Sequence, residues 1–94
     1  MDRQILISSD DYQGWYNVGV NLSTLGKYRH AIIAFDKAIK IKPDYYAAWN
    51  NRGNALKILG RLHLALNNFN LALNMEPNYY LAWYNRGKLL NDLG

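Results

Sequence analysis

Apolar residues recur along the chain at the three- and four-residue spacing of amphipathic helices. Residues 12–25 carry one apolar stripe, made of Trp15, Val18, Leu22 and Leu25. Residues 28–41 carry a second, made of Ala31, Ile32, Phe35, Ala38 and Ile39. Gly26 separates the two stripes, and Pro43 follows the second. Because glycine commonly ends helices and proline cannot continue one, the pattern predicts two helices joined by a tight turn.

The same pattern returns 34 residues later, with helices predicted over 46–59 and 62–75 and a last helix over 80–93. The positions that repeat include Trp15, Trp49 and Trp83, then Gly19, Gly53 and Gly87, then Leu22, Leu56 and Leu90. A fixed period of this length is typical of stacked structural units. We therefore expect the segment 1–11 to be the tail of a preceding unit. The following units are 12–45, 46–79 and, as a first helix only, 80–94.

The small residues of the repeat have a packing explanation. Gly19 and Gly53 are expected to face the partner helix, where a side chain would hold the two backbones apart. From the other side, that helix presents a set of alanines, namely Ala31, Ala38, Ala65 and Ala72. Trp15 and Phe35 are expected to fill the remaining volume.

These motifs resemble the tetratricopeptide repeat family. Residues 15–43 read W-x2-V-G-x2-L, A-x3-F-x2-A, P, and residues 49–77 repeat them with Arg52 in place of the valine. The resemblance implies an all-α fold, a right-handed α-solenoid of antiparallel helix pairs. Arg52 and Arg86 stand where the family usually has a large apolar residue. We expect their stems to pack while their charged heads reach solvent.

Composition excludes several classes of protein. The chain has no cysteine, which removes disulfide and thiolate chemistry, and no run long enough to span a membrane. With no signal peptide visible, a cytoplasmic location is expected. The net charge of +4 arises from scarce acidic residues rather than from one basic face, so no nucleic-acid partner is expected.

No catalytic constellation is visible, so the chain is not expected to be an enzyme or to need a cofactor. His30 and His63 occupy nearly equivalent places in successive second helices, but two histidines without a third ligand make a poor metal site. We interpret them as exposed helix residues. Asp10 and Asp11 are expected to cap the helix that begins at Tyr12.

The resemblance implies that the first helices of the units line a concave groove. Its lining is expected one, two and five residues after each tryptophan: Tyr16, Asn17, Val20, Asn50, Asn51, Asn54, Tyr84, Asn85 and Lys88. Asn17, Asn51 and Asn85 recur at one position, and an amide that both donates and accepts can hold a peptide backbone. The alternative is that these asparagines bond to neighbouring helices. Lys57 and Lys88 should favour neutral or mildly acidic ligands, with Asp92 a local exception.

Some members of the family clamp the C-terminal carboxylate of heat-shock chaperones. That clamp would need Lys at Tyr16, Asn at Val20, Asn at Asn51, Lys at Leu81 and Arg at Asn85, and only Asn51 matches. Without the cations a bound carboxylate would lack its charge partners. The sequence therefore predicts no such clamp.

The function expected from the resemblance is a protein-interaction scaffold that holds an extended peptide or helix of another protein. One alternative is self-association through the C-terminal helix, where Leu89, Leu90 and Leu93 would lack cover. The tyrosine pairs 45–46 and 79–80 offer aromatic contact near the junctions, although packing between units explains them better. A further alternative is a passive spacer in a larger protein.

Overall fold

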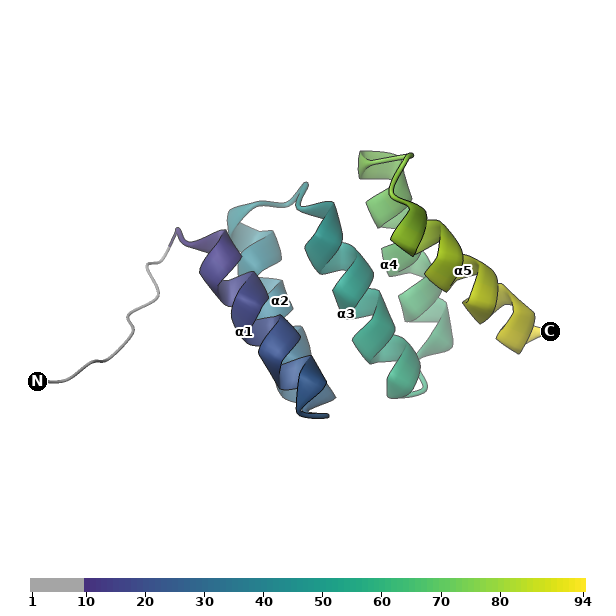
Figure 1. Cartoon of the computed structure of the whole chain (residues 1–94), viewed down its shortest axis with the longest axis horizontal. Helices are drawn as coiled ribbons and strands as arrows, with labels where there is room; N and C mark the ends of the chain where they lie inside the picture. The colour runs from purple at the N-terminus through teal and green to yellow at the C-terminus, as the bar shows by residue number, and fades with distance from the viewer. Residues whose placement is uncertain (1–9) are drawn as a thin grey trace, which may run out of the picture.

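A computed structural model describes residues 10–94, which fold as successive α-helices without strands (Figure 1). The helices are α1 (Tyr12–Thr24), α2 (Tyr28–Ile41), α3 (Tyr46–Ile58), α4 (Leu62–Met75) and α5 (Tyr80–Leu93). The predicted all-α class is confirmed, and only α1 and α3 end one residue earlier than predicted. The expected tail of a preceding unit, in residues 1–9, lies outside the described residues. No helix of the described part is long and apolar enough to cross a membrane.

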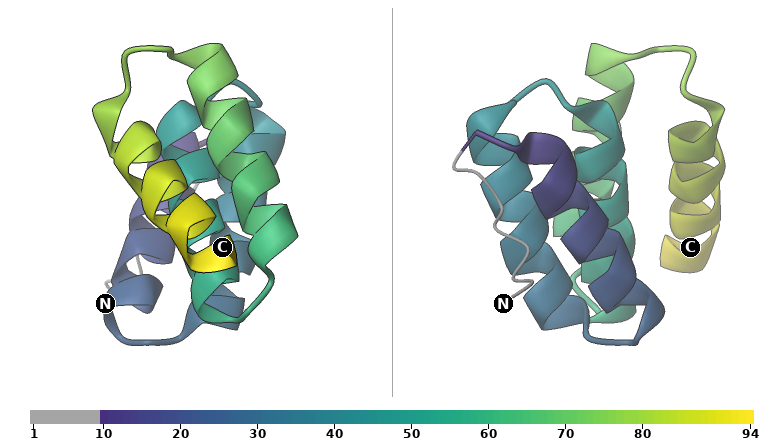
Figure 2. Two further views of the ribbon diagram at one scale, coloured as in Figure 1. Left: turned by 90° about the vertical axis from the view of Figure 1, so that its right-hand side faces the viewer. Right: turned by 60° about the vertical axis from the view of Figure 1, so that its left-hand side comes forward.

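The helices form two layers. Figure 1 shows α1, α3 and α5 side by side in front, with α2 and α4 behind them. Seen from the C-terminal end, α5 lies beside α4 at an angle to it (Figure 2). The molecule is elongated, with extents of 54 × 25 × 17 Å. Each helix therefore contacts only its neighbours along the stack, as in a solenoid.

Glycine ends the first helix of each complete unit. Gly26 and Gly60 adopt φ values of +79° and +83°, a left-handed conformation that favours glycine. At the first turn the amide of Lys27 donates to the carbonyl of Leu22 at 2.8 Å, and the amide of Gly26 donates to Ser23 at 2.9 Å. These two bonds are the Schellman arrangement, and they satisfy carbonyls that the helix end would leave unpaired.

The start of α1 has a side-chain cap. Asp11 Oδ1 accepts a hydrogen bond of 2.8 Å from the amide of Gly14. The expectation of an aspartate cap is therefore confirmed for Asp11. The other four helices begin without a side-chain cap.

The predicted close approach of paired helices is present in both complete units. A Cβ at Gly19 would lie 2.4 Å from the ring of Phe35, and one at Gly53 would lie 2.7 Å from the ring of Phe69. Both phenylalanines are fully buried, as are the four expected alanines, Ala31, Ala38, Ala65 and Ala72. Glycine is required at these two positions because the phenylalanine ring occupies the space of a side chain.

The tryptophans lie at the boundary of the core rather than inside it. Trp15 is half-buried against the first core cluster, and the ammonium group of Lys37 lies 5.0 Å from its ring centre. Trp49 and Trp83 each donate an indole N–H to a proline carbonyl, that of Pro43 at 2.8 Å and of Pro77 at 2.7 Å. The tryptophans therefore fix the turns between units.

The arginines at the unusual positions correct one expectation. Their guanidinium groups form hydrogen bonds with side chains of the second helices. Arg52 donates from Nε to Asp36 at 2.7 Å and from Nη1 to Asn68 at 2.9 Å. Arg86 donates from Nε to Asn70 at 2.7 Å. The planar guanidinium group can reach two second helices at once, which an apolar side chain could not do.

Three of the four tyrosines at the junctions pack against core clusters that join successive units, as expected, although their ring contacts lie within the units 12–45 and 46–79. Tyr45 contacts Tyr12 and Tyr16, each with ring centres 5.0 Å apart. Tyr46 and Tyr79 form an edge-on pair at 4.8 Å. Tyr80, which was expected to resemble them, is exposed instead.

The outer surface of α5 also differs in part from expectation. Leu89 was expected to lack cover, but it is fully buried in a cluster with Leu56, Ala65 and Phe69. Leu89 faces back toward the preceding unit, since it corresponds to Ala55, which is buried as well. Other apolar side chains of α5 are exposed: Tyr80, Leu81, Trp83, Tyr84, Leu90 and Leu93.

Candidate functional site

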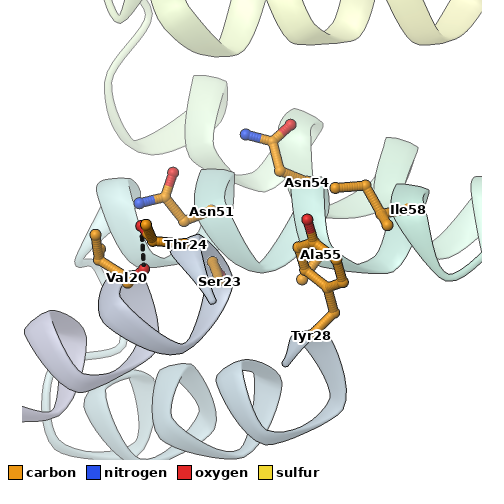
Figure 3. A pocket seen from close by; sticks show the side chains of 8 residues that line it. All are labelled: Val20, Ser23, Thr24, Tyr28, Asn51, Asn54, Ala55 and Ile58. Atoms are coloured by element: carbon orange, nitrogen blue, oxygen red, sulfur yellow. Dashed lines mark hydrogen bonds between the residues drawn. The ribbon is translucent and has the colours of Figure 1, made fainter. Parts of the chain in front are cut away.

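A pocket of about 310 Å³ lies between α1 and α3. We call it the α1–α3 pocket, and it is lined by Val20, Ser23, Thr24, Tyr28, Asn51, Asn54, Ala55 and Ile58. Figure 3 shows that α1 and α3 supply the facing walls and that Tyr28, at the start of α2, lies at one end. The Thr24 hydroxyl is turned back to the carbonyl of Val20 at 3.0 Å. The pocket therefore combines amide and hydroxyl groups with aliphatic side chains.

A chain of hydrogen bonds links the first helices next to this pocket. Asn85 of α5 donates to Asn50 of α3 at 3.1 Å, and Asn50 donates to Asn51 at 3.4 Å. Asn51 in turn donates to the Tyr16 hydroxyl of α1 at 2.9 Å. Because each amide donates in the same direction, the bonds connect α5, α3 and α1 in one network. The network fixes the spacing of the helices that carry the groove.

The three repeated asparagines therefore differ in role. Asn51 and Asn85 bond to neighbouring helices, which was the alternative left open by the sequence. Each still has a second amide hydrogen for another acceptor. Asn17 is exposed, and its side chain makes no hydrogen bond within the described residues. Ligand contact by these asparagines stays a prediction.

The other expected groove residues are distributed unevenly. Val20, Asn51 and Asn54 come together in the α1–α3 pocket. Asn50 corrects an expectation: it is only 2 % exposed, and its amide is bonded on both sides, so it supports the groove rather than lining it. The remaining expected residues on α5, Tyr84 and Lys88, are exposed beyond this pocket.

Burial changes the chemistry of Tyr16. Removal from water raises the pKa of its hydroxyl above the usual 10.0, and the hydrogen bond from Asn51 partly opposes that rise. A raised folded pKa means that the neutral hydroxyl is favoured in the fold. Its contribution to stability is complete below pH 10.0 and is lost as the pH rises through the folded value. The network is therefore intact in the neutral range.

One of the two lysines expected in the groove forms an ion pair, and the other does not. Lys57 of α3 lies 3.8 Å from Asp92 of α5, so the acidic exception expected at position 92 neutralises one of the two expected lysines. The ammonium group of Lys88 lies 5.4 Å from the ring centre of Tyr84. Lys88 is consequently the one of these two lysines whose charge remains unpaired among the described residues.

Five pocket residues were not predicted from the sequence: Ser23, Thr24, Tyr28, Ala55 and Ile58. Most lie one turn beyond a predicted residue, since Thr24 follows Val20 by four positions and Ala55 follows Asn51 by four. Residues at this spacing share a helix face, so the helical period itself indicates that they lie beside the predicted residues. The prediction included only the turn nearest each tryptophan. Tyr28 belongs to α2, and its contribution depends on the turn geometry.

Potential metal ligands do not cluster in the described part of the chain. His30 and His63 are both exposed, as expected. Residues 10–94 contain no group of three or more potential ligands among histidine, aspartate and glutamate. What the site offers is hydrogen bonding and apolar contact.

An elongated stack of helix pairs, with tight glycine turns and close glycine–phenylalanine contacts, defines an α-solenoid of the helix-pair class. Two models of the tetratricopeptide repeat match the sequence, one over residues 12–45 and one over 34–67. The chain belongs to the tetratricopeptide repeat family. A sequence search of curated proteins finds no match.

Solved structures agree with this assignment. The first TPR of Spaghetti (RPAP3) bound to HSP90 peptide SRMEEVD superimposes with a TM-score of 0.86 at 26% identity, over 96% of this chain and 71% of that one. The yeast Sti1 TPR2AB-domain:pHSP90 complex gives 0.86 at 21% identity, over 93% of this chain and 34% of that one. The MamA RS-1 ArsTM double mutant gives 0.82 at 19% identity, over 94% and 49%. The last two identities are low enough that these likenesses show the fold alone.

Proposed function

We propose that this chain is a protein-interaction module that acts by binding, not by catalysis. In this proposal an extended segment or a helix of another protein lies along the first-helix layer and enters the α1–α3 pocket. The observation that carries the proposal is the mixed lining of this pocket, where Asn51 and Asn54 adjoin Val20 and Ile58. Amides suit a peptide backbone, while the aliphatic side chains suit an apolar side chain.

The peptide-bound relative supports a protein partner but not the same peptide chemistry. The Spaghetti domain is described as bound to an HSP90 peptide, SRMEEVD, which is acidic near its end. Here Tyr16 and Asn85 are neutral residues at two positions where the clamp needs a cation. Asn85 is also hydrogen-bonded to Asn50. Lys57 is paired with Asp92. We therefore propose a neutral or weakly acidic segment as the ligand of the α1–α3 pocket, and weak or no binding of an acidic chaperone C-terminus at that pocket.

The expected affinity is modest. A hydrogen bond contributes about 0.5–1.5 kcal/mol net, and burial of an aliphatic side chain contributes about 1.5–3 kcal/mol. A few of each must also offset the loss of freedom on association, which costs at least about 4 kcal/mol. Micromolar binding requires about 8 kcal/mol, so one pocket supports micromolar binding at best. A method that captures transient complexes is therefore required.

Photo-crosslinking tests the proposal directly. A photoreactive phenylalanine analogue replaces Asn54, inside the pocket, or Lys40, which is exposed on α2 outside it. After irradiation in cell extract, position 54 should give a discrete heavier product that position 40 does not give. Mass spectrometry then identifies the captured protein. Equal products from both positions would contradict a specific pocket.

Substitutions then test whether asparagines of the groove, one inside the pocket and one outside it, hold the partner. The double variant Asn17→Ala, Asn54→Ala removes two amides outside the Asn85–Tyr16 network, so the fold should be unchanged. A matched control is Asn67→Ala, Asn74→Ala, which removes two exposed amides from α4. With the partner that mass spectrometry has identified, titration calorimetry on chains without the photoreactive residue should show loss of binding in the first variant at equal helicity, and retention in the control. Retention in both would contradict a binding role for these groove asparagines.

Self-association through α5 is the second candidate function. It is favoured by the exposed apolar side chains of this helix, among them Trp83 at 51 % and Leu90 at 40 % exposure. In that case the crosslinked product would have twice the mass of the chain, and light scattering would show a mass that rises with concentration. The substitutions Trp83→Ser and Leu90→Ser should then restore the monomer mass. A passive spacer would give neither a partner product nor a rising mass.

A further inference from the structure

A second pocket, with a volume of about 240 Å³, lies where the starts of α2 and α4 meet the end of α3. We call it the arginine pocket, and it is lined by Arg29, Ile32, Arg52, Leu56, Leu59, Arg61 and Leu64. None of these residues lines the α1–α3 pocket. It combines three guanidinium groups with four aliphatic side chains, and no acidic residue lines it.

The positive charge of this pocket is only partly neutralised. Asp36 lies next to it and accepts a hydrogen bond of 2.7 Å from Arg52 Nε, while Arg52 Nη1 is bonded to Asn68. Arg29 and Arg61 are exposed, and neither guanidinium group has an ion-pair or hydrogen-bond partner within residues 10–94. One carboxylate against three arginines leaves an excess of positive charge at the mouth.

The start of α4 adds to this preference for an anion. Arg61 is its N-cap residue, no side chain caps the helix, and its first turn contains no acidic residue. The unpaired amides and the positive end of the helix dipole therefore lie in the same turn as Arg61 and Leu64. A 14-residue helix is long enough for the dipole to contribute.

The fold does not require Arg29 and Arg61, the two exposed arginines of the pocket. Residues that build the fold repeat with the period of 34, but His63 stands 34 positions after Arg29 and Lys27 stands 34 positions before Arg61. The arginine pocket is therefore a local departure from the repeat rather than a consequence of it. Departures of this kind at exposed charged positions are where binding specificity is built on a repeat scaffold.

We propose that the arginine pocket binds an acidic and apolar segment of a partner protein, independently of the α1–α3 pocket. A carboxylate of the segment lies between Arg29 and Arg61, where guanidinium groups can bind it in a bidentate manner. An aliphatic side chain next to that carboxylate packs on Leu64 and the floor of the pocket. The aliphatic floor and the small volume favour a peptide over a nucleic-acid backbone, which would need a longer basic stripe.

The test uses a blocked, fluorescently labelled peptide of alternating glutamate and leucine, with a glutamine-for-glutamate peptide as the uncharged probe. Fluorescence anisotropy measures affinity, and amide shifts of the isotope-labelled chain locate the site. We expect saturable binding of the acidic peptide, shifts around the arginine pocket, and affinity that falls with added salt. The double variant Arg29→Gln, Arg61→Gln should weaken binding by about tenfold or more.

A matched variant controls for the loss of net charge. Lys27→Gln, Lys40→Gln removes two exposed positive charges outside the arginine pocket and should change affinity by less than about twofold. Equal weakening by both variants would overturn the proposal in favour of nonspecific attraction. Equal binding of the glutamine peptide, or shifts confined to the α1–α3 pocket, would overturn it as well. Displacement of the peptide by a single-stranded oligonucleotide of the same charge would assign the pocket to nucleic acid instead.

Discussion

Helices α3 and α5 share the same framework residues but differ in what covers them. Tyrosine, alanine, tryptophan, arginine, glycine and leucine occur in both at identical spacing, from Tyr46 to Leu56 and from Tyr80 to Leu90. Yet Leu56 is 4 % exposed and Leu90 is 40 % exposed. The difference therefore arises from the neighbours of each helix and not from its own residues.

The neighbours explain this difference. α3 packs against α2 on one side and α4 on the other, whereas α5 packs against α4 and α3 only. A Cβ at Gly53 would collide with Phe69, but a Cβ at Gly87 would meet nothing within 4 Å. The same motif thus places apolar residues on one face of each first helix. That face becomes buried only where a second helix packs on it, as α4 does on α3.

The largest effect expected from this comparison concerns the two leucines. Leu56→Ala should lower the free energy of unfolding by about 2–5 kcal/mol, because it removes a buried side chain and leaves a cavity. Leu90→Ala should cost about 1 kcal/mol or less, because much of this side chain is already in water. Urea denaturation of the two variants beside the wild type measures both values. Similar losses would mean that α5 is covered in solution, for instance by a second copy.

The arginines test the same comparison through polar contacts. Arg52→Met should cost about 1–3 kcal/mol, since it leaves the Oδ1 of buried Asn68 without its donor. Arg86→Met should cost less than about 0.5 kcal/mol, because its partner Asn70 is only half-buried and water can replace the bond. Thermal unfolding of matched variants gives the comparison.

The interpretation depends on Asn68 being the cause. Adding Asn68→Leu to Arg52→Met removes the unpaired amide and should recover part of the loss. A loss that the second substitution leaves unchanged would instead assign it to the ion pair between Arg52 and Asp36. That pair is half-exposed and is expected to contribute little.

The sequence predicted the helices well because their signals are local. Gly26 and Pro43 mark ends that follow from backbone geometry alone, and the 34-residue period shows that the units are alike. The close approach of the partner helix at Gly19 could be predicted as well, since a glycine repeated within a helix needs a packing reason, but the sequence did not predict that the Phe35 ring fills the space. These features do not depend on which other residues the neighbouring helices carry.

The candidate site was harder to predict because its residues depend on neighbouring units. Asn50 and Asn51 are adjacent in sequence, and the resemblance places both in the lining of the groove. The structure buries the first between Asn51 and Asn85, while the second lines the α1–α3 pocket. Leu89 was misplaced for a related reason, since its position faces the preceding unit. A periodic motif predicts which face of its helix a residue occupies. Whether that residue is buried depends on how helices from different units cross.

The glycines give a small net effect on stability, because a gain in helix propensity offsets part of the crowding at Gly53, but they give the clearest difference in sign. Gly53→Ala places a methyl group 2.7 Å from the ring of buried Phe69, so crowding of about 1–3 kcal/mol should exceed the gain in helix propensity. Gly87→Ala meets no neighbour and should stabilise the chain by about 0.5–1 kcal/mol, because alanine loses less backbone freedom in a helix. Melting temperatures of the two variants should therefore move in opposite directions.

A fall in melting temperature for Gly87→Ala would contradict the claim that position 87 is uncovered. Such a fall would mean that another part of the protein packs on this position. The variant Gly53→Ala, Phe69→Leu provides a control, since a smaller side chain opposite the new methyl group should relieve the crowding. Melting temperatures measured at several protein concentrations distinguish packing by a second copy from packing by the same chain at position 87. If the penalty at Gly87 disappears at low protein concentration, a second copy packs there. If it persists, the cover comes from the same chain, and the difference between α3 and α5 is smaller in solution than their exposed surfaces indicate.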